Sequence, residues 1–379
     1  MPSSSYLGGA SNETTSQTYK QLTKGAAVLS IVTKKYNYIV GVDTHAKKHV
    51  FAIISSLGEL IHSGEFRVLE KDFHRFSLLI KRKTAGGNVL LAIEGTSSYG
   101  ETLTKYLGDR GMDICEVKPP KTKARSGIGK TDHIDAEMAA RGVLHLPIDK
   151  LIRPRIGSKR KILRTLLSSR HLLVKQQTMD KNALNALVRS SDIGTDARFA
   201  LKAKTVRKIA VMRIHKATEA HIVVLRQEAK RLASSIEKRL KQLAENELSL
   251  KKCVNHLAPG LLQMVGVGPI CAATILCAYS HKGRIHSEEA FASIAGVSPL
   301  PASSGNTIHY RLNKNGDRLL NSAFDAIAKC RIRYDNDTKV YLKKRQQDGK
   351  SYRDTKRILK RYIARKIFRY LETLNLGVD

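Results

Sequence analysis

The stretch Lys130-Thr131-Asp132-His133-Ile134-Asp135-Ala136 is the one around which the chain is organised. Apolar residues follow it at helical spacing, so the pattern predicts a helix that begins near Asp132. Residues i and i+3 of a helix share one face, so the carboxylates of Asp132 and Asp135 can point the same way. Two like charges held together cost free energy unless a cation lies between them. The stretch therefore raises the question of a cation site.

A simpler interpretation explains the same stretch as an ordinary helix start. Asp132 is then the N-cap, and Asp135 is a first-turn acid that the helix dipole favours. Taken alone, the stretch favours this simpler interpretation, and the rest of the chain has to decide. Lys130 ends a basic, glycine-rich loop and is a candidate nucleic acid contact.

Upstream of the predicted helix, short apolar runs alternate with helical patterns. The runs predict three strands of an antiparallel meander, followed by strands and helices in alternation. The expected elements are strands at 38–43, 49–55, 60–68, 89–94 and 113–117, and helices at 71–82 and 99–107. This β-β-β-α-β-α-β-α order is typical of a ribonuclease-H-like α/β layer with a mixed sheet.

Two of these apolar strands end in an acid, Asp43 in the first and Glu94 in the fourth. In such a sheet they project from the ends of neighbouring strands, and the helix carrying Asp132 and Asp135 can pack beside them. Four carboxylates at one place suit one or two Mg²⁺ ions, which take oxygen ligands and a substrate phosphate. Such ions polarise a phosphodiester and stabilise the charge on the attacking and leaving oxygens.

The overall charge of the chain points to the same chemistry. Lys and Arg number 67 against 33 Asp and Glu, a formal net charge of +34. That excess favours a polyanionic partner, with nucleic acid as the first candidate and an anionic membrane surface as the weaker one. The five cysteines are scattered without a C-x-x-C pair, which argues against a zinc site. The apolar run from Leu261 to Tyr279 is interrupted by glycines and a proline, so we do not expect it to cross a membrane.

Composition divides the chain into four parts. Residues 1–35 are rich in Ser, Thr and Gly and are expected to be a disordered tail. Residues 36–157 hold the α/β pattern and the acids. Residues 158–256 predict two or more long helices of coiled-coil type, with a break at 190–195. Residues 257–379 are expected to form a mainly helical domain.

The C-terminal part holds two further candidate sites. Gly266 and Gly268 stand before an apolar helical run, a pattern like a helix-hairpin-helix, whose amides can bind a DNA phosphate. A turn in a protein core explains this pattern nearly as well. Ser304 stands in a Ser-Ser-Gly turn, and its hydroxyl could attack phosphorus, although such turns are common without any such role. The basic residues that follow are phosphate-clamp candidates or a solvated face, namely Arg311, Lys314 and Arg318.

Five motifs together closely resemble the DEDD transposases of the insertion sequence one-ten (IS110) family, with the Piv/MooV-type invertases as relatives. The motifs are Gly41-Val42-Asp43-Thr44-His45, Ala92-Ile93-Glu94-Gly95-Thr96, Gly129-Lys130-Thr131-Asp132-His133-Ile134-Asp135-Ala136, Gly266-Val267-Gly268-Pro269 and Pro301-Ala302-Ser303-Ser304-Gly305. The resemblance covers the chain from about Tyr38 to about Leu371.

This resemblance implies a RuvC-like fold for the N-terminal domain, the Holliday-junction-resolvase type of ribonuclease-H fold. It implies that Asp43, Glu94, Asp132 and Asp135 bind Mg²⁺ and that Ser304 is the nucleophile, with Ser303 as the alternative if the register slips. Family members are recombinases that excise and insert their element. They are guided by an element-encoded structured bridge RNA that pairs with donor and target DNA.

The resemblance also implies an assembly and a location. Dimers form tetramers, in which the acids of one subunit meet the serine of another, and the protein is expected in the bacterial cytoplasm, associated with the nucleoid. Two alternatives stay open, a site-specific invertase or junction resolvase, and a nucleic-acid-binding protein whose acids are structural. His45 and His49 are more naturally surface or core residues than substrate contacts.

Overall fold

The computed structural model describes residues 31–118, 131–155, 157–196, 198–214, 219–302, 310–313, 316–374 and 376. Contacts divide the chain into two compact units, residues 1–155 and 156–379, and each is described by itself. Lys130, Ser303, Ser304 and Lys314 lie outside the described residues, as does most of the predicted N-terminal tail.

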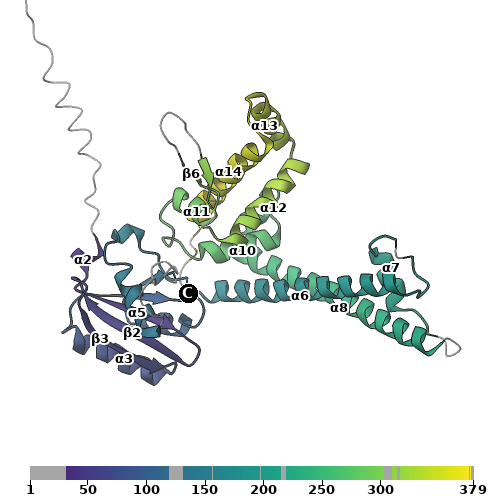
Figure 1. The fold of residues 1–379 in the computed structure, drawn as a ribbon. Helices are drawn as coiled ribbons and strands as arrows, with labels where there is room; N and C mark the ends of the chain where they lie inside the picture. The colour runs from purple at the N-terminus through teal and green to yellow at the C-terminus, as the bar shows by residue number, and fades with distance from the viewer. Residues whose placement is uncertain are drawn as a thin grey trace, which may run out of the picture. The chain divides into compact units, whose positions relative to one another are not determined.

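The N-terminal unit is built on a five-stranded mixed sheet (Figure 1). Its strands are β1 (Tyr38–Thr44), β2 (Lys48–Ser55), β3 (Leu60–Arg67), β4 (Val89–Glu94) and β5 (Asp113–Val117). The strand order is β3-β2-β1-β4-β5, in which the first three strands form an antiparallel meander and β4 and β5 join parallel to β1. The predicted ribonuclease-H-like order is confirmed.

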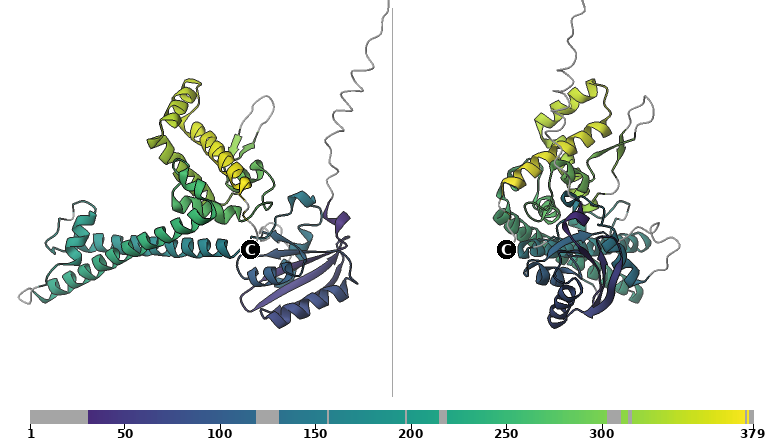
Figure 2. Two further views of the ribbon diagram at one scale, coloured as in Figure 1. Left: turned by 180° about the vertical axis from the view of Figure 1, so that it is seen from behind. Right: turned by 90° about the vertical axis from the view of Figure 1, so that its left-hand side faces the viewer.

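Helices cover both faces of this sheet (Figure 2). On one face, α3 (Glu70–Lys83) and α4 (Glu101–Gly108) bury aromatic and aliphatic side chains against alternate residues of β1, β2 and β4. On the other face, α2 (Val32–Lys35) and α5 (Asp132–Arg141) pack against the intervening residues. Val32 is fully buried, so the folded unit begins before the predicted boundary at residue 36. A 3-10 turn, η2 (Ile148–Lys150), follows α5.

The close approach of α5 to the sheet depends on Gly41. A Cβ atom at this position would lie 1.9 Å from the carbonyl oxygen of Ala136 and 2.7 Å from the backbone nitrogen of Ala140. Any side chain at Gly41 would therefore push α5 away from β1. Because Gly41 has no side chain, α5 packs close to β1, and the acids in its first turn lie beside the end of that strand.

The second unit begins with a long pair of helices, α6 (Ser158–Ser190) and α8 (Ala220–Leu257), with α7 (Ala203–Ala210) packed at one end. The pair is antiparallel, because Arg170 pairs with Glu247 at 3.2 Å and Asp180 pairs with Arg239 at 2.7 Å. The predicted long helices are confirmed, and α6 ends where the break was expected. The boundary predicted after residue 256 falls at the end of α8.

The rest of this unit is a mainly helical domain. Its elements are α9 (Pro259–Gln263), α10 (Pro269–Tyr279), α11 (Glu288–Ile294), β6 (Pro299–Pro301), β7 (Tyr310–Leu312), α12 (Arg318–Tyr334), α13 (Asn336–Gln347) and α14 (Tyr352–Thr373). Tyr279, Phe291 and Phe324 are fully buried at its centre. The apolar run that raised the membrane question thus includes α10, a core helix. Among the described residues, no helix is long and apolar enough to cross a membrane.

Candidate metal centre

The first two predicted acids stand at the ends of neighbouring parallel strands. Val42 is paired with Ile93, so the next residues, Asp43 and Glu94, are neighbours at the carboxyl ends of β1 and β4. The hydroxyl of Thr44 donates a hydrogen bond to the carbonyl oxygen of Glu94 at 2.8 Å, which joins the two strand ends. Alternation along each strand puts both acids on the face that α5 covers, because alternate residues such as Ile39 contribute to the core on that side.

The other two predicted acids lie in the first turn of α5, as expected. The N-cap is Thr131, whose hydroxyl accepts a hydrogen bond from the backbone nitrogen of Ile134 at 3.3 Å. The simpler interpretation of Asp132 as the N-cap is therefore wrong, and its carboxylate is not occupied with capping. Asp135 is buried, whereas the Asp132 side chain is 47% exposed.

A compact group of possible metal ligands forms at this place. Among the described residues, ligand atoms of Asp43, His45 and Asp132 all lie within 4.8 Å of one another. Nε2 of His45 is 3.2 Å from Oδ2 of Asp43 and 3.5 Å from Oδ2 of Asp132. The structure thus places His45 between two predicted ligands, although its sequence position favoured a surface or core role. The spacing Asp-x-His after a strand was the available signal.

The electrostatics of Asp43 show how close the acids are. Burial raises the pKa of this carboxyl above its ordinary value, and the charges of Asp135 and Asp132 raise the pKa further, while His45 opposes them. We call Asp43, Glu94, Asp132 and Asp135 the acid edge, of which Asp43 and Asp132 belong to the close group with His45, whereas Glu94 and Asp135 do not. Carboxylate oxygens and one imidazole nitrogen are ligands that divalent cations accept, and a cation would relieve the repulsion that raises this pKa. The residues present fit a divalent metal ion.

The second histidine near Asp43 has a structural role. His49 is fully buried between aromatic rings of the core, with Phe73 stacked at 6.1 Å between centroids. Its Nδ1 accepts a hydrogen bond from the backbone nitrogen of His45 at 3.3 Å, so it supports the turn that presents His45. Burial lowers the pKa of His49 to about 4, which keeps the ring neutral. The substrate-contact alternative for His49 is therefore wrong.

The predicted nucleic acid contacts of the second unit are placed as follows. Gly268 is the N-cap of α10, and a Cβ there would meet open space. Gly266 has a φ of 81°, and a Cβ there would lie 3.0 Å from the carbonyl oxygen of Ile327 in α12. Arg311 is exposed on β7, and Arg318 is exposed at the start of α12. Gly266 thus has a packing reason of its own, which the core-turn interpretation anticipated.

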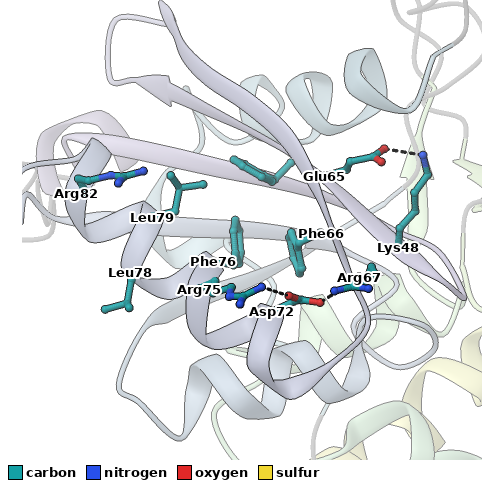
Figure 3. Close-up of a pocket in the computed structure, with 11 residues that line it drawn as sticks. Lys48, Glu65, Phe66, Arg67, Asp72, Arg75, Phe76, Leu78, Leu79 and Arg82 are labelled. Carbon is teal, nitrogen blue, oxygen red and sulfur yellow. Dashed lines mark hydrogen bonds and ion pairs between the residues drawn. The ribbon is translucent and has the colours of Figure 1, made fainter.

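A hollow of about 630 Å³ lies on the opposite face of the N-terminal sheet, between its edge and α3 (Figure 3). Its cations are largely matched by acids. Arg67 and Arg75 both pair with Asp72, at 3.1 and 3.3 Å, and Lys48 pairs with Glu65. The aromatic floor belongs to the core, with Phe66 and Phe76 stacked at 4.2 Å between centroids. Four cations face two acids in this lining, so the hollow keeps a small excess of positive charge.

Comparisons with known proteins agree with the geometry. Residues 40–192 match a family model for DEDD transposases of the IS110 type, described as transposase. Residues 258–343 match a second model, described as transposase of the IS116/IS110/IS902 family. The two matches together cover more than half of the chain. No curated protein matches the chain.

Proposed function

The chain belongs to the IS116/IS110/IS902 family of transposases and is a DNA transposase or recombinase, and we propose that it cuts and rejoins DNA with a Mg²⁺-binding acid site and a serine nucleophile. The observation that carries this proposal is the acid edge. A strand end and the first turn of a helix bring carboxylates together, and the pKa of Asp43 is raised first by burial and then by the charges of Asp135 and Asp132. A divalent cation explains why such an arrangement persists.

The four acids would hold Mg²⁺, with Asp43 and Asp135 from the buried side and Asp132 from the exposed side. Mg²⁺ would supply stabilisation of the charge that develops on the phosphate during strand cleavage. His45 is placed to contact the same ligands or to hold a proton beside them. The hydrogen bond from the Thr44 hydroxyl to the carbonyl oxygen of Glu94 joins the two strand ends.

Ser304 would be the group that attacks. Its oxygen forms a bond to the phosphorus of the scissile phosphodiester, and the bond from that phosphorus to one sugar oxygen breaks. The serine proton is released, and the departing sugar oxygen takes up a proton to become a hydroxyl. One phosphodiester is exchanged for another, so the step needs no further reactant. The later attack of a sugar hydroxyl on the phosphoserine rejoins strands and restores Ser304.

The resemblance to the family supports two further parts of the proposal. The protein would be guided by an element-encoded structured RNA that pairs with donor and target DNA. It would act as dimers that assemble into tetramers, in which the acids of one copy work with the serine of another. The net charge of +34 is consistent with a protein that holds RNA and two DNA duplexes.

The direct experiment is detection of the covalent intermediate. Purified protein with its co-purifying RNA is incubated with element-end DNA and Mg²⁺, and the products are separated on a denaturing gel. We expect a protein–DNA adduct from wild type and from Ser303→Ala, and none from Ser304→Ala. An adduct that persists in Ser304→Ala would overturn the nucleophile assignment.

Mixing variants tests the shared site. Asp43→Ala and Ser304→Ala should each be inactive alone, whereas a mixture should regain part of the activity, because one copy supplies the acids and another the serine. A mixture that stays inactive, although wild-type subunits mixed with either variant are active, would contradict the shared site.

Sequencing of RNA that co-purifies with the protein tests the guide. We expect a structured RNA encoded beside the reading frame. Recombination that proceeds with protein freed of RNA would favour an unguided, invertase-like reaction.

A further inference from the structure

The second unit contains a cavity of about 510 Å³ whose lining carries a large excess of positive charge. Six cations line it, and Asp354 is the acid among its lining residues. The cations are Arg311, Lys350, Arg357, Lys360, Arg361 and Arg365. We call this place the basic cavity. It lies between the β6–β7 hairpin and α14, which are neighbours in Figure 1.

Three of these cations form a row along one helix. Arg357, Arg361 and Arg365 stand four residues apart on α14, so they share one face and are about 6 Å apart along the axis. Neighbouring phosphates in a nucleic acid strand have a comparable separation. A row with this spacing suits a chain of phosphates better than a single small anion.

Acids of α11 hold two arginines of this row in place. Arg365 Nε is 2.9 Å from Oε1 of Glu288, and Arg361 Nη2 is 3.4 Å from Oε1 of Glu289. The same Glu288 carboxylate also pairs with Arg369 at 3.1 Å. Glu288 and Glu289 of α11 therefore orient two arginines of the row. Two acids do not balance all the cations of the cavity, and Glu288 is shared with Arg369.

The remaining charges agree with this excess. Arg357 pairs with Asp354 at 3.0 Å. Lys360 is 3.7 Å from Asp325, but Asp325 also pairs with Lys329 and Lys356, both closer. Burial lowers the pKa of Lys360, and the nearby charge of Lys356 adds to that, while Asp325 opposes it. The hollow of Figure 3 is larger, but its four cations face two acids, a smaller excess than that of the basic cavity.

One aromatic ring completes the lining. Tyr362 is 47% exposed and lies beside the arginine row, with Tyr341 packed edge-on behind it at 6.3 Å between centroids. Exposed rings next to cations stack nucleobases in proteins that bind single strands. A free phosphate would make no use of this ring, whereas a strand would.

We propose that the basic cavity binds the backbone of the DNA strand that is cut. The proposal rests on the proposed function for the choice of DNA, because β6 and β7 flank the segment with Ser304 and both line the cavity through Pro299 and Arg311. The arginine row holds successive phosphates, and Tyr362 holds a base.

The test compares two triple variants of the full chain that lose the same charge. Arg311→Gln, Lys350→Gln and Arg357→Gln together remove three cavity cations, and Asp354 keeps the hydrogen bond that it accepts from the Ser351 hydroxyl. The matched control combines Lys343→Gln, Lys344→Gln and Arg353→Gln, which are exposed cations outside the lining. Affinity for a fluorescent single-stranded oligonucleotide of the element end is measured from about 50 to 200 mM salt.

Each phosphate contact to a single strand contributes about 0.7 to the slope of log affinity against log salt. The cavity variant loses three cations, so we expect the magnitude of its salt slope to be smaller than that of wild type by about 2. The control should keep the wild-type slope. An unchanged slope in the cavity variant, or an equal loss in both variants, would overturn the proposal. If the triple variant does not fold, the single variant Arg311→Gln should still lose about 0.7.

Two further arms separate this proposal from related ones. An RNA oligonucleotide of the same sequence is measured in parallel, and a slope change with RNA alone would overturn the assignment to DNA. The adduct assay tests the proposed function separately. If wild type forms no adduct but the cavity slope falls as expected, the cavity binds DNA and the serine chemistry is wrong. If the cavity variant forms the adduct normally and its slope is unchanged, the serine chemistry stands and the cavity does not bind the DNA strand.

Discussion

The two units of this chain gather opposite charges at their candidate sites. In the N-terminal unit, strand ends and the first turn of α5 bring carboxylates together, and the pKa of Asp43 is raised by burial and by its acidic neighbours. In the second unit, α14 and β7 bring cations together around a cavity. Like charges gather at a cost, so each arrangement indicates a missing partner of opposite charge, a divalent cation in one and a polyanion in the other.

The hollow of Figure 3 sharpens this comparison because its charge is more nearly balanced, with four cations against two acids. Two of its arginines share Asp72, and its lysine pairs with Glu65. Charges that neighbouring opposite charges balance are therefore a weaker sign of a ligand than charges that the protein leaves in excess. The acid edge has an excess of negative charge, and the basic cavity has an excess of positive charge.

The largest expected effect separates chemistry from binding. Asp43→Asn should lower the rate of adduct formation by about 10³-fold or more, because a metal ion contributes several kcal/mol to charge stabilisation in the transition state. Its affinity for element-end DNA should stay within about 2-fold of wild type, since binding depends on the phosphates. Single-turnover gels and anisotropy measure the two quantities.

A buried acid outside the acid edge provides the control for this prediction. Asp72→Asn removes a carboxylate from the hollow of Figure 3, and its adduct rate should remain near that of wild type. Equal losses in both variants would mean that general damage to the fold, and not loss of a ligand, explains the effect of Asp43→Asn.

The next effect tests how the acid edge is assembled. Gly41→Val should destabilise the N-terminal unit by about 3 kcal/mol, because its Cβ would collide with the backbone of α5. Gly108→Ala, at a site where a Cβ meets nothing within 4 Å, should have little effect. Urea unfolding measures both, and a Gly41→Val protein as stable as wild type would contradict the packing of α5 on β1.

The pH dependence of stability tests the core beside the acids. The pKa of His49 falls to about 4 on folding, so the unfolded chain binds a proton below its ordinary pKa that the folded chain refuses. Stability should therefore be complete above about pH 6.5 and fall as the pH drops toward 4, by at most about 3 kcal/mol. Urea unfolding as a function of pH should show that this slope is reduced in His49→Phe. A slope that is identical in the variant would assign it to other groups.

The smallest effect concerns repulsion within the acid edge. Without metal, Asp43→Asn should raise the unfolding temperature at neutral pH by about 2 °C, because it removes a buried charge that its neighbours repel. Adding Mg²⁺ should raise the unfolding temperature of wild type more than that of the variant. A variant less stable than wild type in the absence of metal would show that the contact with His45 outweighs the repulsion.

Much of this architecture could be predicted from the sequence, because the signals are local. Apolar runs bounded by turns gave the strands, and helical spacing after Thr131 gave α5. The meeting of Asp43 and Glu94 also followed, because neighbouring parallel strands end at the same edge of a sheet. The domain boundaries and the roles of the site residues remain predictions.

Other features depended on tertiary packing and could not be predicted. His45 lies beside Asp132 at a turn after β1 whose backbone is held by His49 of β2, and no local pattern indicates that hydrogen bond. The basic cavity combines Arg311 with residues of α14 more than forty positions later, and nothing in either segment indicates the other. The simpler interpretation of Asp132 as the N-cap was one residue too late, since Thr131 and Asp132 are both good capping residues.

The most direct test is the binding of a divalent cation to the metal-free full-length protein, measured by calorimetry with Mn²⁺ and Mg²⁺. The account predicts saturable binding to wild type and to Asp72→Asn, and at least about 10-fold weaker binding to Asp43→Asn and Asp135→Asn, whose carboxylates lie at the acid edge. Equal affinity in all four proteins, or no saturable binding to wild type, would contradict it.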